Sequence, residues 1–404
     1  MMLAEISPSP IIDINDLGLD RGAHLLIKRA LRDVPVAAKL GVRGTAPDLN
    51  VHLMGWCRAQ GHQLEFANNG TAWITRGDAQ AGRWRDSEQA GGSDANASGA
   101  VADFPKAAWG LAARGATVEA GAPEFHFTFA AKETIWANEA AHIYAQAVAA
   151  QWNPDEAIDW SATVELPEEI EDAVVQVMTF LIENENAALL VPARFLGQVH
   201  PHFREVLQVL AIQIADEARH VEVFTRRAVL KSKRLGLSTA GGQASLKTLF
   251  EESEFAIASF LLSVLGEGTF VSLLHFLHLH APDPVTRQIA KLTARDEARH
   301  VAFGMAHLQY QLKNDSGLRS RLAMAIENRF ESLSQTAGLN EEVFDALVLL
   351  AAGQWSPEAI AQGYAKVQTL KEDMAEGRQL RLHRLGFDSS ESNRLASLHT
   401  RNFM

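Results

Sequence analysis

One six-residue string, DEARHV, occurs twice in the sequence, at Asp216–Val221 and again at Asp296–Val301. In each copy two residues separate a glutamate from a histidine, as they separate Glu217 from His220 in the first copy. On a helix this spacing places both side chains on one face, where a carboxylate and an imidazole can bind the same metal ion. The repeat therefore predicts two helices that each present a metal-ligating pair.

Two further glutamates lie in apolar surroundings upstream of the two copies. Glu267 stands between two glycines in the middle of an almost wholly apolar segment, Phe255–Leu277. An unpaired carboxylate is costly in a protein core, so its charge requires a partner. The stretch IENENAALL aligns with LGEGTFVSL and selects Glu185 as the equivalent residue in the first half. Glu183 is the less favoured alternative, and the two glutamates cannot both be ligands, because residues two apart point to different sides of a helix.

Two Glu-x-x-His pairs, with one glutamate from each of two other helices, form the ligand set of di-iron and di-manganese carboxylate bundles. Four carboxylates balance the charge of two divalent metal ions and leave the imidazoles neutral, as ligation requires. Oxygen-rich ligands with one imidazole per metal favour two iron ions, with manganese as the other candidate. The predicted ligands are Glu185, Glu217, His220, Glu267, Glu297 and His300.

The aspartate and arginine of each copy are predicted to support the ligands. Each aspartate stands four residues before the histidine of its own copy, close enough to accept the distal ring proton of that histidine or to bind an arginine. The arginines are expected to hold the aspartates, and the alternative interpretation is a set of surface ion pairs. These residues are Asp216 and Arg219 in the first copy and Asp296 and Arg299 in the second.

Several other histidines are less favoured as metal ligands. Glu139 and His142 repeat the Glu-x-x-His spacing, but they lack the flanking Asp and Arg and are the less favoured pair. His200 and His202 flank a proline in a turn and are expected to be solvated. His275 and His278 follow Glu267 toward the end of its helix, where capping or packing is expected and a role in an access channel is the alternative.

The elements that position these residues are predicted to be helices from about residue 105 to residue 404. The expected fold class is mostly α: a four-helix bundle core over about 165–315, with extra helices after it. The apolar stretch around Glu267 has the length of a membrane span, but the interior of a large bundle requires the same composition. The C-terminal helices are expected to cover the bundle or to form the surface of a homodimer.

The segment 1–77 differs from the helical region in its hydrophobic patterning, because short strand-like and helix-like patterns alternate along it. IIDI, AAKLGVRG, HQLEFA and TAWITR are strand-like, while HLLIKRALRDV and PDLNVHLMGWCRAQG are helix-like. Together they predict a small βαβαββ domain. Residues 78–104 are rich in Gly, Ala, Ser and Asp without hydrophobic periodicity, and they predict a flexible linker.

Composition narrows the function classes. Of the 404 residues 47% are hydrophobic and 21% charged, and the net charge of −12 disfavours a nucleic-acid partner or an anionic membrane. The one cysteine, Cys57, excludes an internal disulfide framework and any cysteine-rich metal site, and its expected environment is an apolar helix face. The N-terminus lacks a basic start followed by an apolar run, so the expected location is the cytoplasm.

The doubled Asp-Glu-Ala-Arg-His string and its upstream glutamates resemble the ferritin-like di-iron superfamily. The resemblance covers about 165–315 and is greatest to its oxygen-activating branch, which includes monooxygenase hydroxylases, ribonucleotide reductase small subunits and arylamine N-oxygenases. Phe224 stands where the reductases keep a radical tyrosine, and Thr293 stands where the N-oxygenases add a histidine. The resemblance implies Glu217 and Glu297 as bridging ligands, Glu185 and His220 on one metal, and Glu267 and His300 on the other.

The N-terminal segment resembles the TusA-type sulfur-carrier family over about 10–77, notably in GLDRGAHLLIKRALRDV and GWCRAQGHQLEF. That family carries sulfur on the cysteine of a Cys-Pro motif, and the matching positions here are Arg21 and Gly22. The domain is therefore interpreted as a carrier fold without carrier chemistry, which would serve in docking or dimerisation.

The predicted function is a di-iron oxygenase or hydroxylase that uses O2 and external electrons to oxidise a small organic substrate. Because no flavin or ferredoxin motif is visible, an external reductase or ferredoxin is expected as a partner. Three alternatives stay open: a ferroxidase or iron-handling protein, an arylamine N-oxygenase, and a non-enzymatic scaffold that a metal stabilises.

Overall fold

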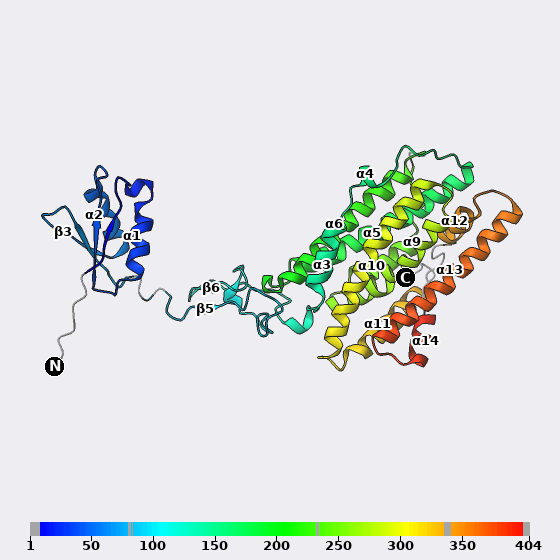
Figure 1. The fold of residues 1–404 in the computed structure, drawn as a ribbon. Helices are drawn as coiled ribbons and strands as arrows, with labels where there is room; N and C mark the ends of the chain where they lie inside the picture. The colour runs from blue at the N-terminus through cyan, green and yellow to red at the C-terminus, as the bar shows by residue number, and fades with distance from the viewer. Residues whose placement is uncertain (1–8, 80–81, 83, 232–233, 335–340, 399–404) are drawn as a thin grey trace. The chain divides into compact units, whose positions relative to one another are not determined.

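The computed structural model describes residues 9–79, 82, 84–231, 234–334 and 341–398 (Figure 1). The chain divides into two compact units. The first unit comprises Met1–Ala90 and Gly115–Pro123, and the second comprises Gly91–Arg114 and Glu124–Met404.

The first unit contains a four-stranded sheet and two helices in the predicted order β-α-β-α-β-β. The strands lie in the order β1-β2-β4-β3, with β1 parallel to β2 and the other neighbours antiparallel. A separate antiparallel pair, β5–β6, follows in the same unit. The elements are β1 (Ile11–Asp13), η1 (Leu19–Arg21), α1 (Ala23–Arg32), β2 (Lys39–Arg43), α2 (Leu49–Gln60), β3 (Gln63–Phe66), β4 (Ala72–Thr75), β5 (Glu88–Gln89) and β6 (Thr117–Val118).

The core of the first unit joins both helices to the sheet. Ile27 of α1 and Leu53 of α2 are fully buried with Leu40 and Ile74 of the strands. Cys57 belongs to the same cluster and is 1% exposed, as the sequence predicts. Burial raises the pKa of its thiol to about 11. A protonated, buried thiol is a poor nucleophile, so Cys57 contributes to packing rather than to chemistry.

The segment predicted as a flexible linker differs from that prediction. Strand β5 lies inside 78–104, and Ala100 and Val101 are buried, with Val101 in the main core of the second unit. The unit boundary falls between Ala90 and Gly91. Small residues suit tight turns and close packing as well as flexible chains, and composition alone does not separate these cases.

Four long helical stretches form the bundle of the second unit, within the range that the sequence predicts. They are arranged as two hairpins: α5 contacts α6, and α9 contacts α10 (Figure 1). The first turn of α5 carries three glutamates, whose negative charge interacts favourably with the positive end of the helix dipole. The Asp283 side chain caps α10 by accepting a hydrogen bond from Thr286 N. The stretches are α5 (Glu168–Leu196), α6 (Arg204–Ala228), α8–η5–α9 (Phe255–Ser259, Phe260–Glu267 and Gly268–His280) and α10 (Pro284–Leu312).

Two of these stretches, Glu168–Leu196 and Phe255–His280, are long and apolar enough to cross a membrane. Their most apolar windows are 72% and 89% buried inside the protein. Both therefore serve as core helices, and the second agrees with the expectation of a bundle interior.

The remaining elements surround the bundle. Among the C-terminal helices, α12 packs on α5 and α13 packs on α9. These helices therefore cover the bundle, which is the first of the two roles predicted for them. The elements are η2 (Ala107–Trp109), η3 (Lys132–Thr134), α3 (Ala140–Ala149), α4 (Pro154–Ala157), η4 (Pro201–Phe203), α7 (Ala240–Phe250), α11 (Leu318–Ser334), α12 (Glu341–Ala352), α13 (Pro357–Arg384) and α14 (Ser389–Ser397).

Candidate metal centre

Six buried side chains from four helical stretches meet inside the bundle. They form two overlapping groups of four, and within each group one ligand atom per residue lies within 4.8 Å of the others. Glu217 and Glu297 belong to both groups. The first group adds Glu185 and His220, and the second adds Glu267 and His300. The structure thus brings together all six ligands that the sequence predicts.

The contacts between these side chains are those of ligands around a common ion. His220 Nδ1 lies 3.0 Å from a Glu217 oxygen and 3.2 Å from a Glu297 oxygen, and His300 Nδ1 lies 3.0 Å from the other Glu217 oxygen. Two atoms that each bind a metal at about 2.1 Å, at right angles, are about 3 Å apart. Glu217 and Glu297 are therefore placed to bridge two ions, each of which also has a histidine.

The carboxylate oxygens support this fit. One oxygen of each of the four glutamates is buried and forms no hydrogen bond with any described residue other than the two histidines of the centre. Buried polar atoms are rarely unpaired in native proteins, and a carboxylate oxygen is a hard ligand that suits iron or manganese. The donor set therefore fits a pair of divalent ions. The oxygens are Glu185 Oε1, Glu217 Oε1, Glu267 Oε2 and Glu297 Oε1.

Without metal, the carboxyl groups repel one another in a dry site. Burial, followed by the charge of neighbouring glutamates, raises the pKa of Glu185 and of Glu267 well above the ordinary value. Burial also acts to raise the pKa of Glu217, but the His300 charge and hydrogen bonds to both histidines outweigh it and hold this pKa low. In the absence of metal, these two glutamates therefore hold their protons more tightly than ordinary carboxyl groups do.

Hydrogen bonds and nearby charges stabilise the protonated form of each of the two histidines by more than burial destabilises it. Burial acts to lower the pKa of His220, whereas bonds to Asp296 and to three glutamates raise it well above the ordinary value. His300 behaves in the same way through nearby glutamates and Asp216. Metal binding must displace these protons, because a ligating imidazole nitrogen is unprotonated.

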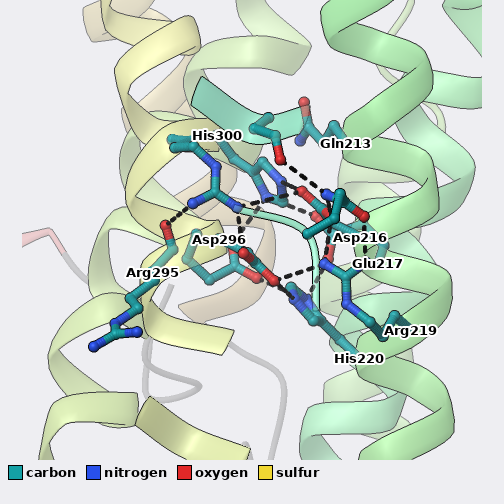
Figure 2. A network of polar contacts seen from close by, with 12 residues as sticks. Gln213, Asp216, Glu217, Arg219, His220, Arg295, Asp296 and His300 are labelled. Carbon is teal, nitrogen blue, oxygen red and sulfur yellow. Dashed lines mark hydrogen bonds and ion pairs between the residues drawn. The ribbon is translucent and has the colours of Figure 1, made fainter. Parts of the chain in front are cut away.

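The aspartates bind the histidines of the opposite copy, which corrects the prediction that each serves its own. His220 Nε2 lies 3.1 Å from Asp296, and His300 Nε2 lies 3.4 Å from Asp216 (Figure 2). Nδ1 of each ring faces the glutamates, so Nε2 points away from the centre, toward the facing helix. The aspartate of the same copy lies one turn away along the same helix. Nε2 of each ring instead meets the aspartate of the facing helix.

Arg219 joins both aspartates, since its guanidinium donates to Asp216 and also to Asp296, at 2.8 Å. Arg299 donates to Asp296 and lies 3.8 Å from Asp216. Both guanidiniums are mostly buried, which excludes the surface ion pairs considered as the alternative. Two arginines thus balance two aspartates, and the charge of the glutamates is left to the metals.

Sequence reasoning missed two partners of this network, Gln151 and Trp152, which lie between α3 and α4. Trp152 Nε1 donates to Asp296 at 2.8 Å, and Gln151 donates to Asp216 at 2.7 Å. The Arg219 guanidinium also stacks on the Trp152 ring, 4.6 Å from its centroid. Their position in a connection far along the sequence from either copy gives no local signal.

A second feature missed from the sequence surrounds Glu267. The segment η5, which ends at Glu267, is a π-helix, a form that is frequent at functional sites. Gln213, one turn before Glu217 on α6, donates to Glu267 at 3.1 Å and is 2% exposed. Its helical spacing from Glu217 is the one signal by which it could have been found.

A small cavity of about 20 Å³ borders three of the glutamates. Its other walls are largely apolar and come from α5, α7, the π-helical segment and α9. A volume of this size holds about one water-sized molecule. The apolar wall is formed by Ala188, Leu246, Leu249, Leu262, Gly266 and Phe270.

The less favoured ligand candidates lie outside the cluster. Glu183 is half-buried and belongs to neither group of ligands, and Glu139 and His142 are exposed at the start of α3. His275 is exposed, and His278 is bonded to the Arg287 carbonyl, in agreement with a packing role.

The expectation that His200 and His202 are solvated is wrong, because each is 2% exposed. His202 Nε2 accepts from Ala102 N at 2.8 Å, and its ring packs on Trp109. Burial, then the Arg114 charge, lowers its pKa to about 4. The turn is thus covered by the segment before α3, and His202 ties that segment to the bundle.

Comparisons with known proteins give matches of fold only. No family model and no curated protein matches the sequence. Among solved structures, a variant of an R2-like ligand-binding oxidase with an anaerobically reconstituted Mn/Fe cofactor is 19% identical, with a TM-score of 0.48. A second variant, with an aerobically reconstituted Fe/Fe cofactor, has the same identity and TM-score. Each match covers 62% of this chain and 94% of the other. The assignment of the centre therefore rests on its own geometry.

Proposed function

We propose that this protein is an oxidoreductase with a dinuclear iron centre, or a mixed manganese–iron centre, that reduces dioxygen. The observation that carries the proposal is the convergence of four buried glutamates and two histidines, with two glutamates shared between the ligand groups. Glu217 and Glu297 would bridge the ions. Glu185 and His220 would complete one site, and Glu267 and His300 the other.

Two ferrous ions held side by side supply electrons to dioxygen when they are bound. The chain supplies the remaining conditions. Glu185, Glu267 and Glu297 border a cavity of about 20 Å³, which admits one small molecule next to the ligands. Its apolar wall keeps bulk water away from the reacting atoms. Because the outer aspartates fix the imidazole rings, the ligand geometry is set before any metal binds.

We propose a small organic molecule as the oxidised substrate, in a reaction of the monooxygenase type. The cavity of about 20 Å³ holds only a molecule about the size of water or dioxygen, and the mainly apolar side chains around it favour the approach of an organic substrate over that of a hydrated ion. Electrons would come from an external reductase or ferredoxin. The first unit, whose one cysteine is buried, would then serve in docking rather than in sulfur transfer.

The experiment that tests the proposal begins with the metal content of the purified protein. Anaerobic loading with Fe(II) and rapid mixing with O2 should then give two ions per chain, oxygen consumption and a transient visible absorbance band. Glu185→Gln should lose one ion and the band. Glu183→Gln is the matched control, because it alters a glutamate of the same helix that lies outside both ligand groups.

Two other outcomes of this experiment would favour a different function. Two ions that do not react with O2 would contradict the proposal and favour a metal-stabilised scaffold. Oxygen consumption with iron released as ferric product, and with no organic substrate oxidised, would instead indicate a ferroxidase.

A further inference from the structure

A row of polar side chains interrupts the apolar core on one side of the candidate centre. From Phe255 to Glu267 the polar residues are Ser259, Ser263 and Glu267 itself, four residues apart. Both serines are buried, at 8% and 3% exposure, and a Ser263 hydrogen bond acts on Glu267. In so apolar a segment, this spacing places the polar groups along one side of the helix.

Helix α10 presents a matching row. Beyond His300 it carries Gly304, His307 and Gln311, spaced by four, three and four residues, which again keeps them on one face. A side chain at Gly304 would meet Ser263 Cβ at 2.7 Å and Ser259 Oγ at 3.4 Å, so the two helices touch at this point. We call the facing residues Ser259, Ser263, His307 and Gln311 the polar seam.

The polar seam contains buried polar atoms without partners. His307 is fully buried, its Nδ1 lies 3.1 Å from the Trp136 carbonyl, and its Nε2 has no partner among the described residues. Since Nδ1 donates to that carbonyl, Nε2 is the acceptor of a neutral ring. Gln311 Oε1 is likewise buried and unpaired among the described residues. Ordered water is the usual partner of such atoms in protein interiors.

The polar seam ends at a pocket of about 420 Å³ at the C-terminal end of α10. Gln311 lines this pocket, as does Phe255, whose ring contacts His307 with centroids 4.8 Å apart. Glu254, Asn314, Asp315 and Arg321 also line the pocket, and the Arg321 guanidinium pairs with both Glu254 and Asp315. From His300 to Gln311 the helix rises about 17 Å, the distance that the polar seam bridges between the pocket and the centre.

We propose that the polar seam is a hydrated path that delivers protons from this pocket to Glu267. The inference rests on the proposed function, because hydroxylation of a substrate RH by O2 takes up two electrons and two protons and yields ROH and water. The external reductase supplies the electrons, and the polar seam supplies the protons. His307 is a positioning residue: its Nε2 accepts from water and keeps the path continuous where the core is otherwise apolar.

The geometry favours protons over other cargo. At Gly304 the helices are in contact, so no organic molecule or hydrated ion passes between them. A proton needs only a chain of hydrogen bonds. The hydroxyls of the two serines, the His307 ring and the Gln311 amide stand about one helical turn apart, so the proposed chain is completed by a water molecule between neighbouring groups. Burial lowers the pKa of His307 to about 4, which keeps its ring neutral as an acceptor.

The first test is a crystal structure of the metal-loaded protein at a resolution that shows ordered water. Water bonded to His307 Nε2 and to Gln311 Oε1 is the expected result. A dry Nε2 in contact only with carbon atoms would overturn the proposal.

The second test compares oxygen consumption in H2O and D2O for two variants, His307→Phe and Gln311→Leu. Each should retain two metal ions and slow by about a hundredfold or more, the lower end of a lost proton-transfer contribution, with a larger solvent isotope effect. His278→Phe is the matched control, because it makes the same change and also loses a bond to a backbone carbonyl, away from the polar seam. Gln311→Leu keeps the test valid if His307→Phe does not fold.

The results separate the two proposals. If the wild-type protein consumes oxygen and both variants match it in rate and isotope effect, the polar seam carries no protons and the proposed function stands. If the loaded wild-type protein consumes no oxygen, both proposals fail.

Discussion

The crossed contact between Asp296 and His220 leads to a quantitative prediction. Asp296→Asn keeps the size of the side chain but removes the charge that accepts from His220 Nε2 at 3.1 Å. A change to the hydrogen-bond partner of a metal-ligating histidine typically weakens metal binding by 10- to 100-fold, or about 1.4–2.7 kcal/mol. The loss should fall on the ion bound by His220, although Asp296 stands beside His300 in sequence.

Mn(II) affinity, measured anaerobically by calorimetric titration in two single-site backgrounds, tests this prediction. His300→Ala leaves the His220 site, and there Asp296→Asn should cost the full 10- to 100-fold. His220→Ala leaves the His300 site, where the same substitution should cost little. Asp216→Asn should give the reverse pattern, because it accepts from His300. A larger loss at the His300 site on Asp296→Asn would refute the crossed pairing.

Four further predictions concern metal binding and stability. Mn(II) affinity should fall as pH falls from 8 to 6, as competition with a chelating dye would reveal, because raised pKa values keep protons on the ligand histidines and on two glutamates. Gly304→Ala should lower the free energy of unfolding by about 1–3 kcal/mol, since the new Cβ would lie 2.7 Å from Ser263 Cβ, whereas Gly197→Ala meets nothing and should be nearly neutral in the same thermal melts. His202 stays neutral down to about pH 4 in the folded state but takes up a proton near pH 6.5 when unfolded, so stability should fall across that window as pH falls, and His202→Gln should flatten the pH profile of denaturant unfolding. Arg227→Met leaves two buried carboxylates unpaired and should cost about 3–5 kcal/mol in urea unfolding, and a loss under 1 kcal/mol would contradict this account.

The ligand residues were predictable because their chemistry conflicts with their surroundings. Glu267 ends the stretch Phe255–Glu267, which is otherwise apolar apart from two serines, and the Glu-x-x-His spacing occurs in two identical strings. Such a conflict is informative, since a buried charge persists only where something compensates it. The same residues also predicted the two hairpins, because each of the two upstream glutamates must face the Glu-x-x-His pair that follows it after a short connection. Helical periodicity and the alternating pattern before residue 77 gave the order of elements in both units.

The other features depend on contacts that sequence spacing does not encode. The π-helix before Glu267 replaces the regular helix that the same letters also permit. Trp152 and Gln151 reach the aspartates only because the connection after α3 lies against the bundle. His202 was expected in water because prolines and turns are usually exposed, and tertiary packing by a distant segment overrides that tendency.

The exchange of aspartates between the two halves bears on how this domain arose and how it folds. A hairpin of α5 and α6 alone contains Glu185, Glu217 and His220, but the aspartate that bonds to its histidine lies on α10. The second hairpin depends on α6 in the same way. Neither half is therefore complete by itself, and an ancestor with a single hairpin would have worked only as a symmetric pair. Gene fusion of such a pair would turn an association between subunits into cooperativity within one chain, and separately expressed halves should regain metal binding only when they are mixed.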